Sequence, residues 1–235
     1  MSETALHLVI ANKNYSSWSA RPWLLLTELG IPFEEIQIKF NTTEWEIELP
    51  ALSPTRRVPV LWEGAPKNGV VTYDSLAIVE RIHELFPEKN VLPKDPLARA
   101  RARSLMAAFH SGFQDFREAM PMNIRASYKG FGHTEQCLKE IDELSKLLVE
   151  AKQTYGSHGP FIFGEYSAAD AFFTPVNSRF KTYGYVSEYS DIQELQDTLL
   201  TTESMKLWVK GALDEQDFVA EDEPYTVKQE SDSSK

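Results

Sequence analysis

The residues best suited to chemistry lie in one hydroxyl-rich stretch near the start of the chain, Asn14-Tyr15-Ser16-Ser17-Trp18-Ser19. This stretch stands between a short apolar run and RPWLLLTELG, whose pattern predicts a helix. A hydroxyl there can donate a hydrogen bond to an anion, and the unpaired N–H groups and partial positive charge of a helix N-terminus add to the attraction. The stretch therefore predicts a site for a group that carries or develops negative charge.

A second place of this kind is Asp74-Ser75, just before another predicted helix. The hydroxyl and backbone N–H of Ser75 can meet a carboxylate at the helix start. Both stretches also have a plainer interpretation, because serine and aspartate before a helix commonly serve as N-caps. The residues alone leave both interpretations open.

Composition limits the possible partners. The chain has 235 residues with 24 basic and 35 acidic side chains, a net charge of −11. This charge opposes non-specific binding to nucleic acid or to an anionic membrane, both of which need a basic surface. We expect small molecules or another protein as partners. Residues 221–235, EDEPYTVKQESDSSK, are acidic and poor in apolar side chains, which predicts a flexible, solvated tail.

The single cysteine, Cys137, forbids an intrachain disulfide and a thiolate zinc cluster, and its setting favours packing over reactivity. The histidines show no metal-ligand spacing, so no metal is expected. The start of the chain does not resemble a signal peptide, and the apolar runs are too short to cross a bilayer. These features predict a cytoplasmic protein.

The elements that position the first site follow a β-α-β pattern. Residues 5–11 predict a buried strand, and a helix follows with Pro22 in its first turn and Gly30 at its end. Residues 33–39 alternate apolar and charged side chains, which predicts a half-exposed strand. A right-handed crossover would make the two strands parallel.

Residues 58–63 and 69–73 predict two more strands, and residues 75–86 a helix. With a loop or short helix before residue 58, this order is the thioredoxin-like plan. Pro59 lies inside an apparent strand, where proline is tolerated only at an edge or an irregular point. Either a cis Val58–Pro59 bond or a trans proline in an edge strand would account for it.

The strand signals stop after a connector at residues 88–94. Apolar side chains at helical spacing predict amphipathic helices over 95–128, 134–155, 167–183 and 203–213, with a shorter one over 191–200. Such helices must pack on one another. The predicted organisation is thus an α/β thioredoxin-like domain (1–87), a linker (88–94), an all-α helical bundle (95–220) and the acidic tail (221–235).

Four motifs in this order resemble those of cytosolic glutathione S-transferases. The stretch at residues 14–19 resembles the S-S-C motif of zeta-class and related bacterial members, and Ser53-Pro54-Thr55-Arg56-Arg57-Val58-Pro59-Val60-Leu61 resembles N-P-x-x-x-V-P-x-L. Tyr73-Asp74-Ser75-Leu76-Ala77-Ile78 resembles (E/D)-S-x-A-I, and residues 163–170 resemble G-x-x-x-(S/T)-x-A-D. The resemblance covers residues 5 to about 213 and implies the glutathione transferase fold.

The resemblance also implies a chemistry and assigns residues to it. Glutathione is the co-substrate, and the hydroxyl of Ser16 would stabilise its thiolate, with Ser17 beside it in the glutathione site. Tyr15 is a rival donor to the sulfur and would border the second substrate. Asp74 and Ser75 would hold the γ-glutamyl end, and the backbone of Val58 would pair with the cysteinyl part. Arg57 would attract the glycyl carboxylate.

The helical half would contribute Arg179 and Tyr183, one helical turn apart, to a site for an acidic or polar electrophile. An arginine in a surface or interdomain ion pair is the plainer alternative. Ser167 and Asp170 form a capping-box pattern, which we interpret as structural.

One departure from the resembled motif narrows the activity. Trp18 stands where the zeta-class pattern has cysteine, so reduction through an enzyme cysteine is disfavoured. The leading hypothesis is a transferase that adds the glutathione thiolate to an electrophile. The alternatives are a glutathione-dependent isomerase similar to maleylacetoacetate isomerase and a non-catalytic binding or assembly module. Family members are commonly homodimers through the thioredoxin-like half, and the resemblance implies the same here.

Overall fold

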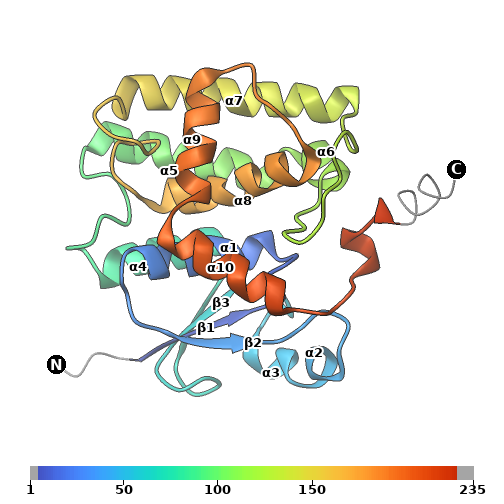
Figure 1. Cartoon of the computed structure of the whole chain (residues 1–235). Coiled ribbons are helices and arrows are strands. Elements are labelled where there is room, and N and C mark those ends of the chain that lie inside the picture. The colour runs from blue at the N-terminus through green and yellow to red at the C-terminus, as the bar shows by residue number, and fades with distance from the viewer. Residues whose placement is uncertain (1–4, 227–235) are drawn as a thin grey trace, which may run out of the picture.

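The computed structural model describes residues 5–226, in which a mixed α/β half and an all-helical half lie against each other (Figure 1). The first half comprises β1 (Leu6–Ile10), α1 (Ser17–Glu28), β2 (Glu34–Gln37), α2 (Thr43–Ile47), α3 (Leu49–Leu52), β3 (Val60–Glu63), β4 (Val70–Tyr73) and α4 (Ser75–Leu85). The second comprises α5 (Pro96–Ser111), α6 (Gln114–Ala119), α7 (Glu135–Tyr155), α8 (Ala168–Tyr183), α9 (Ser190–Leu200) and α10 (Glu203–Asp214), followed by a 3₁₀ turn at Ala220–Asp222.

The four-stranded sheet has the order β2-β1-β3-β4. Strands β1 and β2 are parallel, whereas β1–β3 and β3–β4 are antiparallel. The predicted thioredoxin-like plan, with its parallel first pair, is confirmed. The Val58–Pro59 peptide bond is cis, and the strand that follows it is central in the sheet. The alternative of a trans proline in an edge strand is therefore wrong.

Each face of the sheet is covered by a different layer, because successive side chains of a strand point to opposite faces. Leu8 and Ile10 of β1 belong to the large core that includes α1, whereas Val9 packs with Leu49 and Leu52 of α3. Helix α1 lies between the sheet and α8, so both of its sides are buried (Figure 1). The helix whose N-terminus carries the serine stretch is thereby fixed in the middle of the molecule.

Helix α1 begins earlier than expected. The pattern predicted Pro22 in the first turn, but the helix starts at Ser17 and Pro22 lies inside it. The reason is the cap: Ser16 accepts a hydrogen bond from the backbone N–H of Ser19, which starts the helix before the proline. Pro22 has no N–H to donate to the carbonyl four residues earlier, and its ring crowds that carbonyl, as any proline inside a helix does.

The predicted helix over 95–128 is also wrong. Helix α5 ends at Ser111, Gly112 caps it, and Phe113 has a left-handed backbone conformation with φ 59° before α6 starts. Residues 120–134 contain no helix, and Pro121 cannot continue one in its interior. Apolar spacing was kept across the break because both helices bury side chains in the same core. The other four predicted helices are present as α7, α8, α9 and α10.

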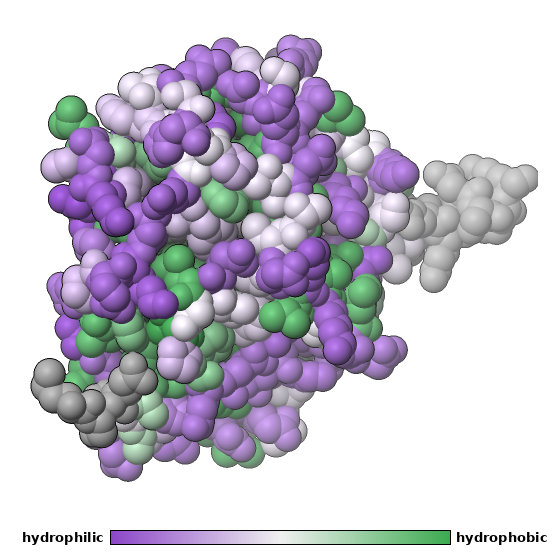
Figure 2. Space-filling view, turned by 60° about the vertical axis from the view of Figure 1, so that its left-hand side comes forward, coloured by the Kyte–Doolittle hydropathy of each residue, from purple (hydrophilic) through white to green (hydrophobic). Residues whose placement is uncertain are grey.

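The chain after α10 differs from the predicted solvated tail as far as it is described. Residues 221–226 lie against the molecule, where Glu223 contacts Tyr15 and the Tyr225 hydroxyl donates to the Ala119 carbonyl at 2.8 Å. The remaining predicted tail, 227–235, lies outside the described residues. Within 5–226, no helix is both long and apolar enough to cross a membrane. The face in Figure 2 is mostly hydrophilic, with hydrophobic residues in small separate patches.

Candidate functional site

Two adjoining cavities lie at the N-terminus of α1. The first has a volume of about 560 Å³, and its lining includes Arg57, Val58, Asp74, Ser75 and His110. The second has a volume of about 440 Å³, and its lining includes Tyr15, Ser17, Arg117, Arg179 and Asp222. Ser16, Trp18 and Phe40 line both. The serine stretch therefore forms the boundary between two spaces, each large enough for a small molecule.

Ser16 is the N-cap of α1 and only 4% exposed. Its oxygen accepts from the backbone N–H of Ser19 at 3.3 Å, and its hydroxyl donates to Ser19 Oγ at 2.8 Å. Ser19 Oγ in turn accepts from the backbone N–H of Ala11 at 3.2 Å. The plain capping interpretation is thus a fact of the structure. It does not compete with a role in chemistry, because the same residue borders both cavities.

Ser17 and Tyr15 face the second cavity and are not among the residues that line the first. Ser17 Oγ accepts from Arg179 Nη2 at 3.0 Å. The Tyr15 hydroxyl accepts from Arg125 Nη2 at 2.8 Å and lies within hydrogen-bond distance of the Asp217 carbonyl and the Glu223 carboxylate. Burial and Glu223 raise the pKa of Tyr15 to about 12. With its hydroxyl bound this way, Tyr15 is a poor donor to a sulfur in the first cavity.

Arg57 and Val58 form one wall of the first cavity. The turn before them is held by Ser53, whose hydroxyl donates to the Arg57 carbonyl at 2.7 Å and accepts from the Arg57 N–H at 3.1 Å. The Arg57 side chain is exposed and Val58 is half-buried. The cis peptide bond after Val58 stands at the start of β3, where an extended ligand could add main-chain hydrogen bonds to the sheet.

The opposite wall is the start of α4. Asp74 is its N-cap and accepts from the Leu76 N–H at 2.8 Å, with an unusual backbone φ of 75°. Ser75 is 1% exposed. Sequence reasoning missed His110, which reaches this wall from α5 and places Nε2 3.2 Å from the Asp74 carboxylate. Burial lowers the pKa of His110 most, while Asp74 opposes that shift.

A buried cation lies behind the site. Arg21 is 1% exposed, has no ion pair within residues 5–226, and donates only a long hydrogen bond, 3.4 Å, to Ser75. Its guanidinium carbon lies 4.0 Å from the centre of the Trp18 ring and 4.5 Å from that of Phe172. Burial lowers the Arg21 pKa well below its ordinary value, and Arg179 is the next cause. The Trp18 ring, which lines both cavities, thus packs against the Arg21 guanidinium.

The two residues expected from α8 have different surroundings. Arg179 lines the second cavity and is 4% exposed, with Nε donating to the Met120 carbonyl at 2.7 Å. Burial lowers its pKa to about 10. Tyr183 lines neither cavity. Its hydroxyl is buried and donates to the Pro121 carbonyl at 2.9 Å, so its expected place beside the second substrate is wrong.

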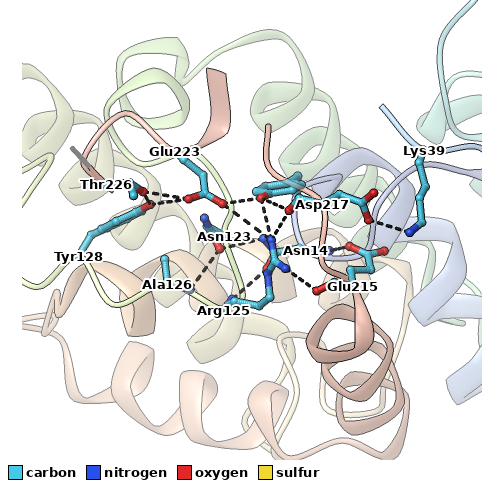
Figure 3. A network of polar contacts seen from close by, with 11 residues as sticks. Asn14, Lys39, Asn123, Arg125, Ala126, Tyr128, Glu215, Asp217, Glu223 and Thr226 are labelled. Atoms are coloured by element: carbon cyan, nitrogen blue, oxygen red, sulfur yellow. Dashed lines mark hydrogen bonds and ion pairs between the residues drawn. The ribbon is translucent and has the colours of Figure 1, made fainter. Parts of the chain in front are cut away.

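The segment after α10 reaches the second cavity with Asp222. Arg125 lies at the centre of the polar network that holds this segment (Figure 3). Arg125 donates to the backbone carbonyls of Glu215 and Asp217. Glu215 is 5% exposed, and its carboxylate accepts from the backbone N–H groups of Lys13 at 2.7 Å and Asn14 at 3.0 Å. The loop that leads to Ser16 is therefore held by a segment 200 residues further along the chain.

The structure also shows the surroundings of the single cysteine, the capping box of α8 and the possible metal ligands. Cys137 is buried at the start of α7, as the packing interpretation predicted, and burial raises the pKa of its thiol to about 11. Ser167 and Asp170 form the predicted capping box at the start of α8. Among residues 5–226, no three His, Cys, Asp or Glu side chains are grouped as metal ligands.

His110, Arg117 and Asp222 are site residues that the sequence did not reveal. Each lies in a segment whose local pattern indicates only a helix or an acidic tail, and folding alone brings them to the cavities. Trp18 carried a signal, since it adjoins the serine motif.

Comparison with known proteins gives a consistent picture. The family model described as the glutathione S-transferase N-terminal domain matches residues 15–85. A protein of Caenorhabditis elegans, named probable maleylacetoacetate isomerase, is 25% identical over 186 residues, which cover 78% of this chain and 84% of the relative. FtsZ-localized protein A of Caulobacter vibrioides is 35% identical over 94 residues, 39% of this chain and 40% of that protein.

A solved structure has the same fold over almost the whole chain. It is a glutathione transferase homologue from Burkholderia with bound glutathione, superposed with a TM-score of 0.64. The match covers 90% of this chain and all of the other, at 22% sequence identity.

Proposed function

Because this chain belongs to the cytosolic glutathione S-transferase superfamily, we propose that it is an enzyme that binds glutathione in the first cavity, ionises its thiol, and adds the sulfur to an electrophile held in the second. The observation that carries the proposal is the position of Ser16. It caps the N-terminus of α1 and borders both cavities, so a sulfur beside it can reach a molecule in either space.

The thiol must lose its proton to react, since the thiolate is the nucleophile. A free thiol titrates near 8.5, and lowering that pKa by about two units requires roughly 2.7 kcal/mol of stabilisation of the anion. A hydrogen bond from Ser16 and the positive end of α1 are each worth on the order of 1 kcal/mol. The Ser16 hydroxyl has one hydrogen, which points to Ser19. It must rotate toward the sulfur and give up that bond.

The rest of the first cavity fits the tripeptide. Asp74 and Ser75 offer a carboxylate to the γ-glutamyl ammonium and a hydroxyl to its carboxylate. The backbone of Val58 is available for strand-like pairing with the cysteinyl part, and the exposed Arg57 offers a positive charge to the glycyl carboxylate. Ser17, although expected in this site, lines only the second cavity, and we assign it to the second substrate with Arg179.

In the proposed reaction the thiol proton passes to solvent, and the sulfur attacks an electrophilic carbon of the second substrate. With a halide leaving group, a carbon–sulfur bond forms as the carbon–halogen bond breaks. No change of oxidation state is needed and no enzyme cysteine takes part, in keeping with the buried position of Cys137.

A glutathione-dependent isomerase is the second candidate, favoured by relatives named maleylacetoacetate isomerase. In such a reaction glutathione is released unchanged, so consumption of glutathione separates the two activities. A non-catalytic module is the third, because one relative is named FtsZ-localized protein A. Absence of any thiolate signal on adding glutathione would favour the module.

We further propose a cytoplasmic homodimer joined through the thioredoxin-like half. The support is a set of exposed apolar side chains on β4 and the start of α5, namely Val70, Tyr73 and Leu97, which are 62%, 44% and 70% exposed. Burying such exposed apolar side chains against a second copy favours association.

The test of the catalytic assignment is ultraviolet difference spectroscopy of the thiolate on adding glutathione. We expect a thiolate signal at neutral pH in the wild type. Ser16→Ala should raise the apparent pKa of the bound thiol by about one unit, since a hydrogen bond worth on the order of 1 kcal/mol is lost. The rate of conjugation at pH 7 should fall accordingly.

Tyr15→Phe is the matched control, because it also removes a hydroxyl from the same loop. We expect it to keep the thiolate pKa. If Ser16→Ala leaves the pKa and turnover unchanged while Tyr15→Phe abolishes turnover, the assignment of Ser16 is wrong.

A further inference from the structure

The segment that follows α10 contributes one carboxylate, that of Asp222, to the lining of the second cavity. Asp222, in the 3₁₀ turn Ala220–Asp222, lines this space together with Ser16 and Arg179. Among residues 5–226, the Asp222 carboxylate takes part in no hydrogen bond or ion pair within 4 Å. No hydrogen bond or ion pair therefore gives the Asp222 carboxylate a role in holding the fold together.

Asp222 is held in place by its neighbours and not by its own side chain. Its backbone N–H donates to the Val219 carbonyl at 3.0 Å. On one side of it in the sequence, Arg125 binds the Asp217 carbonyl, and on the other, Glu223 accepts from Thr226 at 2.9 Å and contacts Tyr15 (Figure 3). The position of the carboxylate is thus fixed by contacts that a change at Asp222 would leave intact.

The charged groups around Asp222 show how its carboxylate changes the electrostatics of the second cavity. Arg179 interacts electrostatically with Asp222, and its three hydrogen bonds go to Met120 O, Pro175 O and Ser17 Oγ, all uncharged. These partners do not neutralise the positive charge of Arg179, and the Asp222 carboxylate offsets part of it. Burial raises the Asp222 pKa to about 6, and Arg179 opposes that shift. The other charged or titratable groups that line this cavity are Tyr15, Arg117, Glu118 and Arg179. Outside the lining, Glu221, Glu223 and Tyr183 interact electrostatically with Asp222.

We propose that Asp222 determines the substrate specificity of the second cavity by disfavouring electrophiles that carry a carboxylate there. A substrate carboxylate that approaches Arg179 meets the like charge of Asp222 in a partly desolvated space, and like charges brought together across an interface are strongly unfavourable. Neutral electrophiles do not meet this barrier. The inference rests on the proposed function, and it weighs against the isomerase alternative, whose substrate is a diacid.

The experiment compares two compounds that differ only in charge, 4-chloro-3,5-dinitrobenzoate and 4-chloro-3,5-dinitrobenzamide. Both lose chloride when the glutathione sulfur attacks the same ring carbon. The readout is the ratio of kcat/KM for benzoate over benzamide, in which effects on the thiolate cancel. In Asp222→Asn we expect this ratio to rise roughly tenfold at pH 7.5, because the benzoate gains from removal of the like charge and the benzamide does not.

Glu221→Gln is the matched control. It removes the same charge from the adjacent, exposed position, which does not line the cavity. Its ratio should stay within about twofold of the wild type, as expected for a solvent-screened charge. An unchanged ratio in Asp222→Asn, or an equal rise in Glu221→Gln, would overturn the proposal.

The pH profile supplies an independent readout. Asp222 becomes neutral as the pH falls through about 6, whereas the electron-poor benzoate stays ionised. The wild-type ratio should therefore rise between pH 7.5 and 5.5, and that of Asp222→Asn should stay flat. Parallel profiles in the two proteins would contradict the proposal.

If the proposed function is wrong, the results differ from those that would contradict the role of Asp222. If the wild type conjugates neither compound, the transferase assignment fails, and the specificity of the cavity is then read from dissociation constants by calorimetry. A tighter benzoate Kd in Asp222→Asn than in the wild type, at equal benzamide Kd, supports the inference. Equal benzoate affinity in both proteins, or no binding of either compound to the wild type, overturns it.

Discussion

Single side chains in this molecule serve structure and chemistry at once. Ser16 caps α1 and borders both cavities, and Asp74 caps α4 while its carboxylate meets His110. The sequence could identify these residues because capping and anion binding need the same groups, a short polar side chain beside free N–H groups. The sequence could not show whether such a residue only caps a helix or also binds a ligand, because this depends on whether a cavity lies beside the residue.

Cys137 gives a prediction at the scale of one residue. Its thiol is buried in the core of the helical half, and burial raises its pKa to about 11. Because the thiolate is the reactive form, a disulfide reagent at pH 8 should leave the folded protein unmodified. In guanidinium chloride it should modify one thiol per chain, the only one present. Rapid labelling of the folded protein at full stoichiometry would contradict this and reopen the question of cysteine chemistry.

At the scale of elements, the sequence predicted best where local chemistry and packing agree. Strands β1 and β2 and helices α7 and α8 have clear periodicity with suitable ends, and all were found close to their predicted limits. The prediction of one helix over 95–128 was wrong because the apolar side chains of α5 and α6 keep the same spacing on both sides of Gly112 and Phe113. Apolar periodicity indicates which side chains face the core, but it does not show where the helical backbone is interrupted between them.

The start of α8 provides the prediction for an element. The buried Asp170 carboxylate accepts from the backbone N–H groups of Ile162 at 3.0 Å and Ser167 at 2.8 Å. Asp170→Ala leaves both donors unsatisfied, which should cost about 3 kcal/mol of unfolding free energy. Urea unfolding measures this change. Glu165→Ala, at an exposed position nearby, is the control and should cost under about 0.5 kcal/mol.

The pH dependence of that loss has a definite sign. Burial raises the folded-state pKa of Asp170 to about 6, from an ordinary value of 3.8. Between these values the folded state binds more protons than the unfolded state, so this group's contribution to stability falls as the pH rises. The variant lacks the group, and the cost of Asp170→Ala should be larger at pH 5 than at pH 7. A cost that grows toward neutral pH would contradict the assignment.

At the scale of the whole molecule, the site depends on parts of the chain that are far apart in sequence. Trp18 and Ser16 come from the first half, His110 and Arg179 from the helical half, and Asp222 from the segment after it. Acidic composition suggested that this last segment is solvated, and composition alone cannot show that Tyr15 and Arg125 contact Glu223. Its contacts arise from tertiary structure, which is why the second cavity was the least predictable part.

Arg125 allows this dependence to be tested. Its guanidinium donates to the carbonyls of Glu215 and Asp217 and to the Tyr15 hydroxyl, and its side chain is 24% exposed. Hydrogen bonds from a charged group are worth about 1.5–3 kcal/mol, so Arg125→Ala should lower the melting temperature by several degrees. Endoproteinase Glu-C should then cut faster after Glu221, whereas the bond after Glu223 precedes Pro224 and is resistant.

The control is Arg103→Ala, which removes an arginine that binds one carboxylate with two hydrogen bonds. Arg103 pairs with Glu80 at 2.8 Å, but both side chains are 43% exposed, and exposed pairs contribute only about 0–1 kcal/mol. Its melting temperature and its cleavage after Glu221 should stay close to those of the wild type. Both arginines donate several hydrogen bonds, and they differ in burial, in partners and in the segment they hold. Equal effects of the two substitutions on cleavage would mean that Arg125 does not hold the segment against the second cavity.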